Sequence, residues 1–196
     1  MEKKRGLKAF FGAQDMTVGN PTTVLLKFAL PLLLGNFVQQ LYNTVDAIVV
    51  GYYIGDSALA AVGAANPILN LLLSLFMGVA TGAGIVVAQY FGAKDRKMLS
   101  ASVGNILFLT IVTSVFVSVV GVVASRPFLD LLQTPDSIID GASAYLMIFM
   151  AGFLGCAFYN MGSGILRGLG DSVMPLIYLI ICCGINIVLD VAFVAG

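Results

Sequence analysis

Five long apolar stretches constrain the fold of this chain more than any other feature of its sequence. A helix of about 20 apolar residues crosses the hydrocarbon core of a bilayer. The stretches that reach this length lie near residues 28–53, 57–91, 99–124, 142–166 and 173–195. Hydrophobic residues make up 59% of the chain, above the roughly 45–50% of soluble domains. We therefore predict an all-α membrane protein, a bundle of five transmembrane helices.

The second stretch, residues 57–91, is longer than one crossing requires. A proline inside a helix removes a backbone hydrogen bond and bends the helix. We expect the ends of this stretch, or a kink at Pro67, to absorb the excess length. Connections are expected where Gly, Pro, Ser and charged residues gather, among them "SRPFLDLLQTPDSIIDG" at 125–141 and "RGLGDS" at 167–172.

The distribution of positive charge predicts the orientation of the chain. Lys and Arg are retained on the cytoplasmic side of a membrane. Only Arg126 falls on one side of the predicted spans, so we place that side outside and the N-terminus inside, in the cytoplasmic (inner) membrane. Residues 1–20 then form a basic cytoplasmic tail and residues 21–196 the transmembrane part. The basic residues on the inner side are Lys3, Lys4, Arg5, Lys8, Lys27, Lys94, Arg96, Lys97 and Arg167.

An odd number of spans places the C-terminus outside, directly after the fifth span. A complete membrane protein seldom ends in this way, with no polar residues after its last apolar stretch. We therefore expect the chain to be a fragment, a truncated reading frame or one part of a larger assembly.

Two acidic residues, Asp46 and Asp190, lie well inside predicted spans. An ionisable side chain at membrane depth is costly, so by default it faces protein or water and has a function. Asp46 lies about 18 residues past the inner end of its span and Asp190 about 17, or roughly 26 Å of helical rise each. Because both spans run outward, both carboxylates reach the outer half of the membrane at similar depth.

Each of these acids has polar neighbours on its own helix. In the first span, polar residues recur every three or four positions and share one face. In the fifth span, an amide precedes the acid by four residues. Two acids with amide oxygens form a candidate site for Na⁺ or a shared proton at Asp46, Asn186 and Asp190. The other polar residues either line a cavity or join helices by hydrogen bonds: Asn36, Gln39, Gln40 and Asn43.

Other features have structural interpretations. Small residues of the second span are expected to let helices pack closely, and three tyrosines near span ends are expected to anchor the membrane interface. No basic stripe is interleaved with aromatic residues, which argues against a nucleic-acid partner. We expect no cofactor beyond the coupling ion. The small residues are Gly78, Gly82, Gly84 and Gly92 with Ala80, Ala83 and Ala88, and the tyrosines are Tyr52, Tyr53 and Tyr145.

Four stretches together resemble the multidrug and toxic compound extrusion (MATE) family of secondary transporters. The match runs from about Met16 to the last residue. The resemblance implies two six-helix lobes around a central cavity, with this chain similar to five of the six helices of the N-terminal lobe. The four stretches are "LPLLLGNFVQQLYNTVDAIVVGYYIG", "QYFGAKDRK", "ILRGLGDSVMPLIY" and "NIVLDVAFVAG".

The resemblance also implies a function. Family members are antiporters that export cationic, often aromatic compounds in exchange for Na⁺ or protons, and they are not enzymes. Their first-helix aspartate matches Asp46, and their fifth-helix asparagine and aspartate match Asn186 and Asp190. The implied partners are membrane lipid, a cationic small molecule, and the missing sixth helix and C-terminal lobe, without which we expect the chain to be inactive.

Three other interpretations stay open at this point. The sequence "GLGD", Gly168 to Asp171, superficially fits the GxGD pattern of intramembrane aspartyl proteases, although Asp171 also suits a helix N-cap. A lipid-linked oligosaccharide flippase of related fold would need cationic residues facing a central cavity, and no Lys or Arg lies deep in a predicted span. The third is a nonfunctional remnant or an interaction partner.

Overall fold

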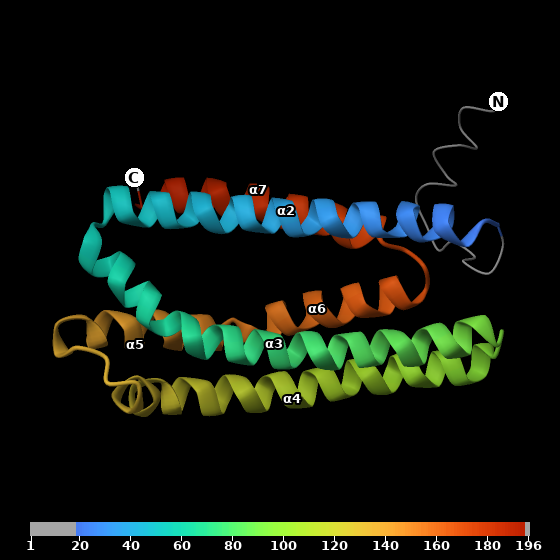
Figure 1. The fold of residues 1–196 in the computed structure, drawn as a ribbon. Coiled ribbons are helices and arrows are strands. Elements are labelled where there is room, and N and C mark those ends of the chain that lie inside the picture. The colour runs from blue at the N-terminus through green and yellow to red at the C-terminus, as the bar shows by residue number, and fades with distance from the viewer. Residues whose placement is uncertain (1–18, 195–196) are drawn as a thin grey trace.

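The computed structural model describes residues 19–194, and within them it contains six helices and no strand. The all-α prediction is confirmed for this part of the chain. The predicted basic tail lies almost entirely outside the described residues. In chain order the helices are α2 (Pro21–Tyr53), α3 (Asp56–Gly92), α4 (Arg96–Leu131), α5 (Asp136–Ala151), α6 (Phe153–Gly168) and α7 (Val173–Val194) (Figure 1).

Polar side chains begin three of these helices. Asn20 accepts a hydrogen bond from a backbone N–H in the first turn of α2, at 3.1 Å. Asp95 and Asp171 do the same for α4 and α7, at 3.0 Å. Such caps satisfy N–H groups that have no partner within the helix. The local sequence therefore specifies where α2, α4 and α7 begin.

The predicted fourth span, residues 142–166, contains two helices. α5 and α6 meet at Gly152 and are bent by 52° relative to each other. Sharp kinks occur at glycines and prolines, where the backbone ladder is most easily interrupted. The sequence-based span did not include this bend, because apolar composition gives the length of a crossing and not its direction.

α4 continues to Leu131, well into the segment predicted to be a connection. The predicted connection, residues 125–141, is wrong at both ends. α4 and α5 both extend into it, and only four residues separate the two helices. Ser125 and Leu129 are fully buried at a spacing of four, on the side of α4 that packs on α5. Burial of this face outweighs the turn signal of Pro127, which is accommodated inside the helix.

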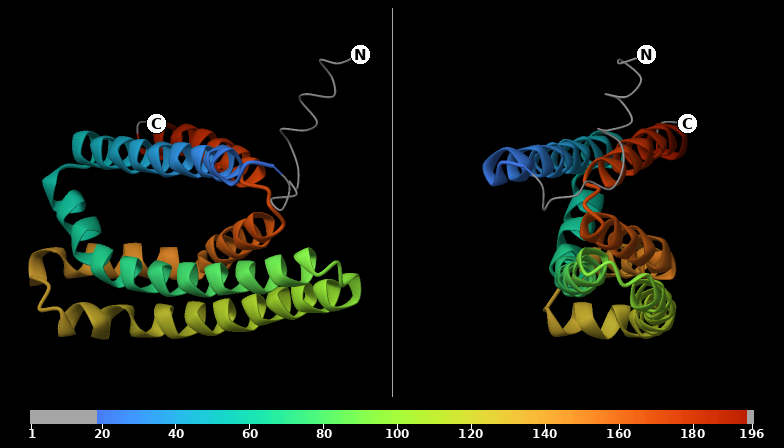
Figure 2. Two further views of the ribbon diagram at one scale, coloured as in Figure 1. Left: turned by 45° about the vertical axis from the view of Figure 1, so that its right-hand side comes forward. Right: turned by 90° about the vertical axis from the view of Figure 1, so that its right-hand side faces the viewer.

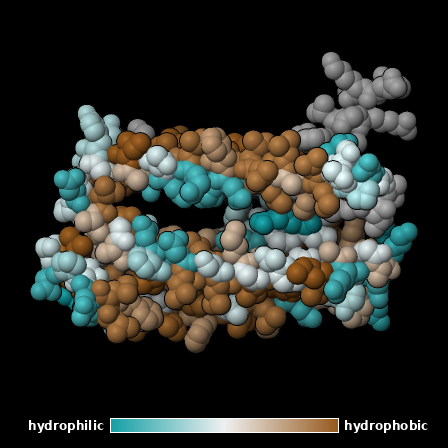
Figure 3. Space-filling model, in the orientation of Figure 1, coloured by the Kyte–Doolittle hydropathy of each residue, from teal (hydrophilic) through white to brown (hydrophobic). Residues whose placement is uncertain are grey.

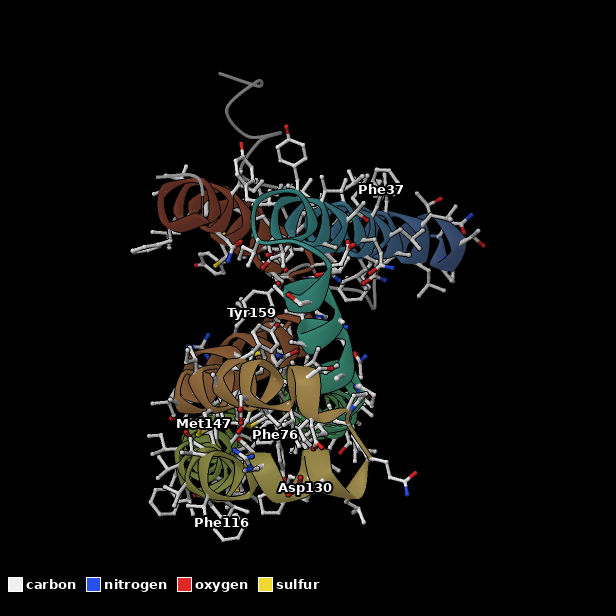
Figure 4. All side chains as sticks on the ribbon, turned by 90° about the vertical axis from the view of Figure 1, so that its left-hand side faces the viewer. Phe37, Phe76, Phe116, Asp130, Met147 and Tyr159 are labelled. Atoms are coloured by element: carbon white, nitrogen blue, oxygen red, sulfur yellow. The ribbon has the colours of Figure 1, made fainter. Side chains whose placement is uncertain are left out.

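The helices form two layers. α3, α4, α5 and α6 pack as one bundle, and α2 and α7 lie side by side in a second layer (Figures 1 and 2). Among the described residues, the buried hydrophobic clusters consist of bundle residues. One of them holds the Phe76 and Phe153 rings edge to face, with centroids 4.8 Å apart, and Figure 4 shows Phe76 inside the bundle. The hydrophobic core therefore sits in one layer.

The first part of α3 is inclined to the remainder and connects the two layers (Figure 1). Pro67 lies inside this helix, as predicted for a kinked second span. The rest of α3 runs along α4 in the bundle. The bend in α3 thus separates the α2/α7 layer from the bundle.

The closest approach between helices joins α3 to α6. A Cβ added at Gly84 would lie 2.7 Å from the carbonyl oxygen of Gly164, and one added at Gly164 or Gly168 would collide with the backbone of Ala80 or Gly84. The prediction of close packing is therefore confirmed for Gly84 and Ala80. It is wrong for three other glycines, because an added Cβ would meet nothing within 4 Å at Gly78, Gly82 and Gly92.

By length and composition, three described helices can cross a membrane: α2, α3 and α4. The bent pair α5–α6 makes a fourth crossing when the two helices are counted as one span, and the apolar part of α7, Val173–Leu189, is shorter. The beginning of α2, the α3–α4 turn and the end of α6 lie at one end of the molecule (Figure 1). The fold is that of a multi-pass membrane protein whose described basic residues gather at that end, apart from Arg126.

Candidate functional site

The predicted polar face of α2 borders the space between the layers. Asn36, Gln40 and Asn43 are exposed, and Gln39 and Asp46 are half-buried. The Asn43 amide donates a hydrogen bond to Gln40 Oε1 at 3.3 Å. Figure 3 shows hydrophilic residues along the middle of α2, beside a hollow that separates the α2/α7 layer from the bundle. These positions can meet water inside the protein outline, which accounts for amides in an apolar helix.

α7 runs beside α2 in the same direction (Figures 1 and 2). A Cβ added at Gly35 would lie 3.7 Å from the Leu176 side chain and 3.8 Å from the Leu179 side chain, so Gly35 lies level with this turn of α7. Asp46 follows Gly35 by 11 residues on α2, and Asp190 follows Leu179 by 11 residues on α7. Because each residue adds about 1.5 Å of rise in either helix, we expect Asp46 near the level of the Asn186–Asp190 turn.

Asn186 carries a buried amide oxygen that has no hydrogen-bond partner. Leaving a buried acceptor unsatisfied costs about 1–3 kcal/mol, so it requires an explanation such as a water or an ion. Amide oxygens are ligands that hard cations prefer. The Asn186 oxygen is therefore available as a cation ligand. Asp190 lies one turn further along α7, and its side chain is outside the described part of the structure.

Asp46 also interacts with the bundle. Its carboxylate lies close enough to the Tyr145 phenol on α5 to act on it electrostatically. Tyr145 is half-buried on α5. The sequence contained no signal for this pairing, because it joins residues 99 positions apart on helices that lie in different layers.

A second tyrosine connects the bundle to α7, the other helix of the α2/α7 layer. Figure 4 places Tyr159 of α6 between the bundle and the α2/α7 layer. Its hydroxyl donates a hydrogen bond to the Pro175 carbonyl near the beginning of α7, at 3.4 Å. This bond holds the first turn of α7 against the bundle. Asn186 lies farther along α7, beyond the turn that this hydrogen bond holds.

The aspartate of the "GLGD" sequence has a structural role. Asp171 is 5% exposed, and one of its oxygens accepts hydrogen bonds from the backbone N–H groups of Val173 and Met174. The N-cap interpretation is confirmed, and Asp171 lies at the opposite end of α7 from Asp190. Within the described residues, no group of three or more His, Cys, Asp or Glu side chains could hold a metal ion.

Comparisons with known proteins identify the family of the chain. The MatE family model matches residues 31–192. "Probable multidrug resistance protein YoeA" of Bacillus subtilis (strain 168) is 34% identical over 86% of this chain, and "Probable multidrug resistance protein YpnP" of the same organism is 32% identical over 93%. A solved structure of a MOP superfamily transporter from Pyrococcus furiosus superposes on 89% of this chain with a TM-score of 0.83 at 29% identity.

The match covers only part of each relative. The chain spans 36% of the length of YoeA, 41% of YpnP and 38% of the P. furiosus transporter. The matched residues include α2 from Pro31 onward and α7 to Ala192, so they contain every predicted site residue. On this evidence the chain belongs to the MATE family of membrane transporters, which is a family of transporters and not of enzymes.

Proposed function

We propose that the chain is the cation-binding part of an antiporter that exports cationic drugs or other xenobiotics across the cytoplasmic membrane, with its N-terminus in the cytoplasm. Na⁺ or a proton binds between α2 and α7 at Asp46, Asn186 and Asp190. One observation carries this proposal. α7, which runs beside the polar face of α2, carries a buried amide oxygen that has no partner, at Asn186.

The coupling mechanism follows from charge. When the site is empty, the Asp46 carboxylate leaves a negative charge beside the hollow, and a cationic compound is attracted to it. When Na⁺ or a proton binds, this charge is neutralised and the attraction is lost. Cation and exported compound therefore oppose each other's binding, and by linkage the effect is reciprocal. The polar face of Asn36, Gln39, Gln40 and Asn43 lines the path of the compound.

α2 is suited to respond to the bound cation. Only Pro31 is buried among its residues, whereas α3 contributes seven buried residues to the bundle. Few packing contacts must break when α2 shifts, and segments with few buried contacts open at the lowest free-energy cost. Binding at Asp46 thus changes the position of α2 relative to the bundle.

Transport also requires parts that this chain does not supply. The relatives are more than twice as long as the matched segment. Alternating access needs one half of a transporter to rock against the other around the site. We infer that a sixth helix and a C-terminal lobe complete the antiporter, either in the same reading frame or in a partner chain.

Efflux of ethidium from drug-sensitive bacterial cells tests the proposal, with the chain expressed alone and together with a C-terminal lobe. We expect efflux only when both parts are present, and loss of efflux in the Asp46→Asn variant. Asp56→Asn is the matched control, because it also removes a carboxylate, one that is exposed at the beginning of α3 and outside the candidate site. Full efflux by Asp46→Asn would rule out this site as the coupling site.

A further inference from the structure

A cavity of about 250 Å³ lies between α2, α3 and α6, away from the candidate cation site. Most of its wall is apolar, and three polar side chains interrupt that wall. Phe28, which lines it on α2, precedes Asp46 by 18 residues, or roughly 27 Å of helix. The cavity therefore lies toward the basic end of the molecule. Its lining includes Phe28, Met77, Thr81, Ile85, Asn160 and Arg167.

Arg167 is the charged residue of this cavity. Its Nε atom is buried and has no hydrogen-bond partner. The ion pair found among the described residues joins Arg126 to Asp140, so no described acid lies within ion-pair distance of Arg167. A guanidinium is permanently charged and offers five N–H donors and no acceptor. An unsatisfied donor of this kind indicates that the cavity binds an acceptor, and preferably an anion.

The sequence placed Arg167 in a connection, on the inner side of the membrane. In the structure it belongs to the last turn of α6, next to the close α3–α6 contact at Gly164 and Gly168. Gly84, Gly164 and Gly168 form this contact and also line the cavity. The tight contact between α3 and α6 therefore forms one wall of the cavity next to the charge.

The other two polar side chains of the cavity do not compete with Arg167 for an anion. The Thr81 hydroxyl donates to the Met77 carbonyl at 2.8 Å, and the Asn160 amide donates to the Cys156 carbonyl at 2.9 Å. Their donors serve their own helices, which leaves the guanidinium as the principal donor to a ligand. A cavity with an apolar wall and one cation suits a ligand whose anionic group is attached to an apolar part. It also suits a free anion that binds next to an apolar surface.

We propose that this cavity binds a phosphate group through Arg167, supplied either by a phospholipid headgroup or by free phosphate. Arginine matches phosphate geometry with two parallel N–H···O bonds, which are strong charge-assisted bonds. The volume exceeds the roughly 30 Å³ of a single water several-fold. The site is independent of the proposed antiport, because it uses neither Asp46 nor Asn186.

Thermal unfolding of the purified protein in neutral detergent tests this site without any transport. The probes are phosphatidylglycerol, inorganic phosphate, and diacylglycerol as a phosphate-free lipid. A phosphate ligand at 100 times its Kd should raise the melting temperature by roughly 5–10 °C. A shift with phosphatidylglycerol alone identifies a lipid headgroup as the source, and a shift with inorganic phosphate identifies the free ion.

Two arginine variants test whether Arg167 causes the phosphate-dependent shift in melting temperature. Arg167→Gln should abolish the shift, and Arg126→Gln should retain it, because Arg126 pairs with Asp140 at the other end of the molecule. Absence of a shift with both phosphate probes would overturn the proposal. So would an equal shift with diacylglycerol, or an unchanged shift in Arg167→Gln.

A cavity-filling variant keeps the test decisive if Arg167→Gln does not fold. Ala88 lines the cavity from α3 and is exposed, so Ala88→Phe fills the space without entering the buried core. Loss of the phosphate-dependent shift in a folded Ala88→Phe protein supports the site. A full shift in this variant contradicts it.

Discussion

The bundle and the α2/α7 layer are both made of long apolar helices, yet they are held together very differently. In the most apolar 18-residue window of α3, 22% of residues are buried, whereas 6% are buried in that of α2. Backbone meets backbone where α3 crosses α6, but α2 and α7 approach through leucine side chains at ordinary contact distance. Apolar composition therefore does not measure packing. The candidate cation site lies in the loosely packed layer, where a bound ion can change the arrangement.

The largest effect on stability is expected at Gly164 in the bundle. In Gly164→Ala the new Cβ collides with the Ala80 backbone, which cannot rotate away as a side chain can. We expect a loss of about 1–3 kcal/mol or more, typical of overpacking, measured by thermal unfolding in detergent. Gly162→Ala on the same helix is the control, because its Cβ would meet nothing within 4 Å. Equal stability of the two variants would contradict the close α3–α6 contact.

Gly121 tests the bundle at a contact with a flexible side chain. A Cβ added there would lie 2.5 Å from the sulfur of Met150, a residue that is only 1% exposed. Because methionine adapts its shape, Gly121→Ala should cost about 1 kcal/mol, the lower end of the overpacking range. The cost should shrink in a Met150→Ala background, and a double-mutant cycle measures this coupling. Strict additivity would show that the two residues do not meet.

Ser118 tests a polar contact inside the bundle. Its hydroxyl donates to the Met150 carbonyl of α5 at 2.5 Å. Hydrogen bonds between membrane helices contribute about 0.6 kcal/mol on average, so Ser118→Ala should lower stability by about that amount. The Thr113 hydroxyl bonds only within α4, and Thr113→Val should change stability less. The unfolding free energies of both variants in detergent check this order.

The smallest effect is expected at Gly35 in the α2/α7 layer. A Cβ there would lie 3.7 Å from Leu176 and 3.8 Å from Leu179, which are ordinary contact distances. Alanine also favours a helix over glycine by about 1 kcal/mol. Gly35→Ala should therefore leave stability unchanged or raise it slightly. A loss as large as that of Gly164→Ala would show that the two layers are equally tightly packed.

The sequence predicted the helical fold and part of the packing. The apolar lengths located the helices that can cross a membrane, and Asp171 was recognised as a helix N-cap because caps are local interactions. Asn20 and Asp95 cap α2 and α4 in the same way. The bend at Gly152 and the extension of α4 through Pro127 were missed, because tertiary contacts decide both. Local composition describes what a segment prefers, and the bundle core overrides it where buried faces must meet.

The candidate site was predictable only in part. Asp46 and Asn186 stand out because ionisable and amide groups at membrane depth are costly, and helical spacing puts them on defined faces. Tyr145 near Asp46 and the buried Nε atom of Arg167 were not predictable in this way. Both depend on how separate helices pack, and a spacing rule within one helix carries no such information.

The most direct test of the α2/α7 site is a double-mutant cycle on cation-induced stabilisation. The melting temperature is measured with and without Na⁺, and across pH, for the protein, for Asp46→Asn, for Asn186→Ala and for the double variant. A shared site predicts that Asp46→Asn removes the cation-dependent shift and that Asn186→Ala changes nothing further in that background. Independent, additive losses, or a full shift in Asp46→Asn, would contradict the account.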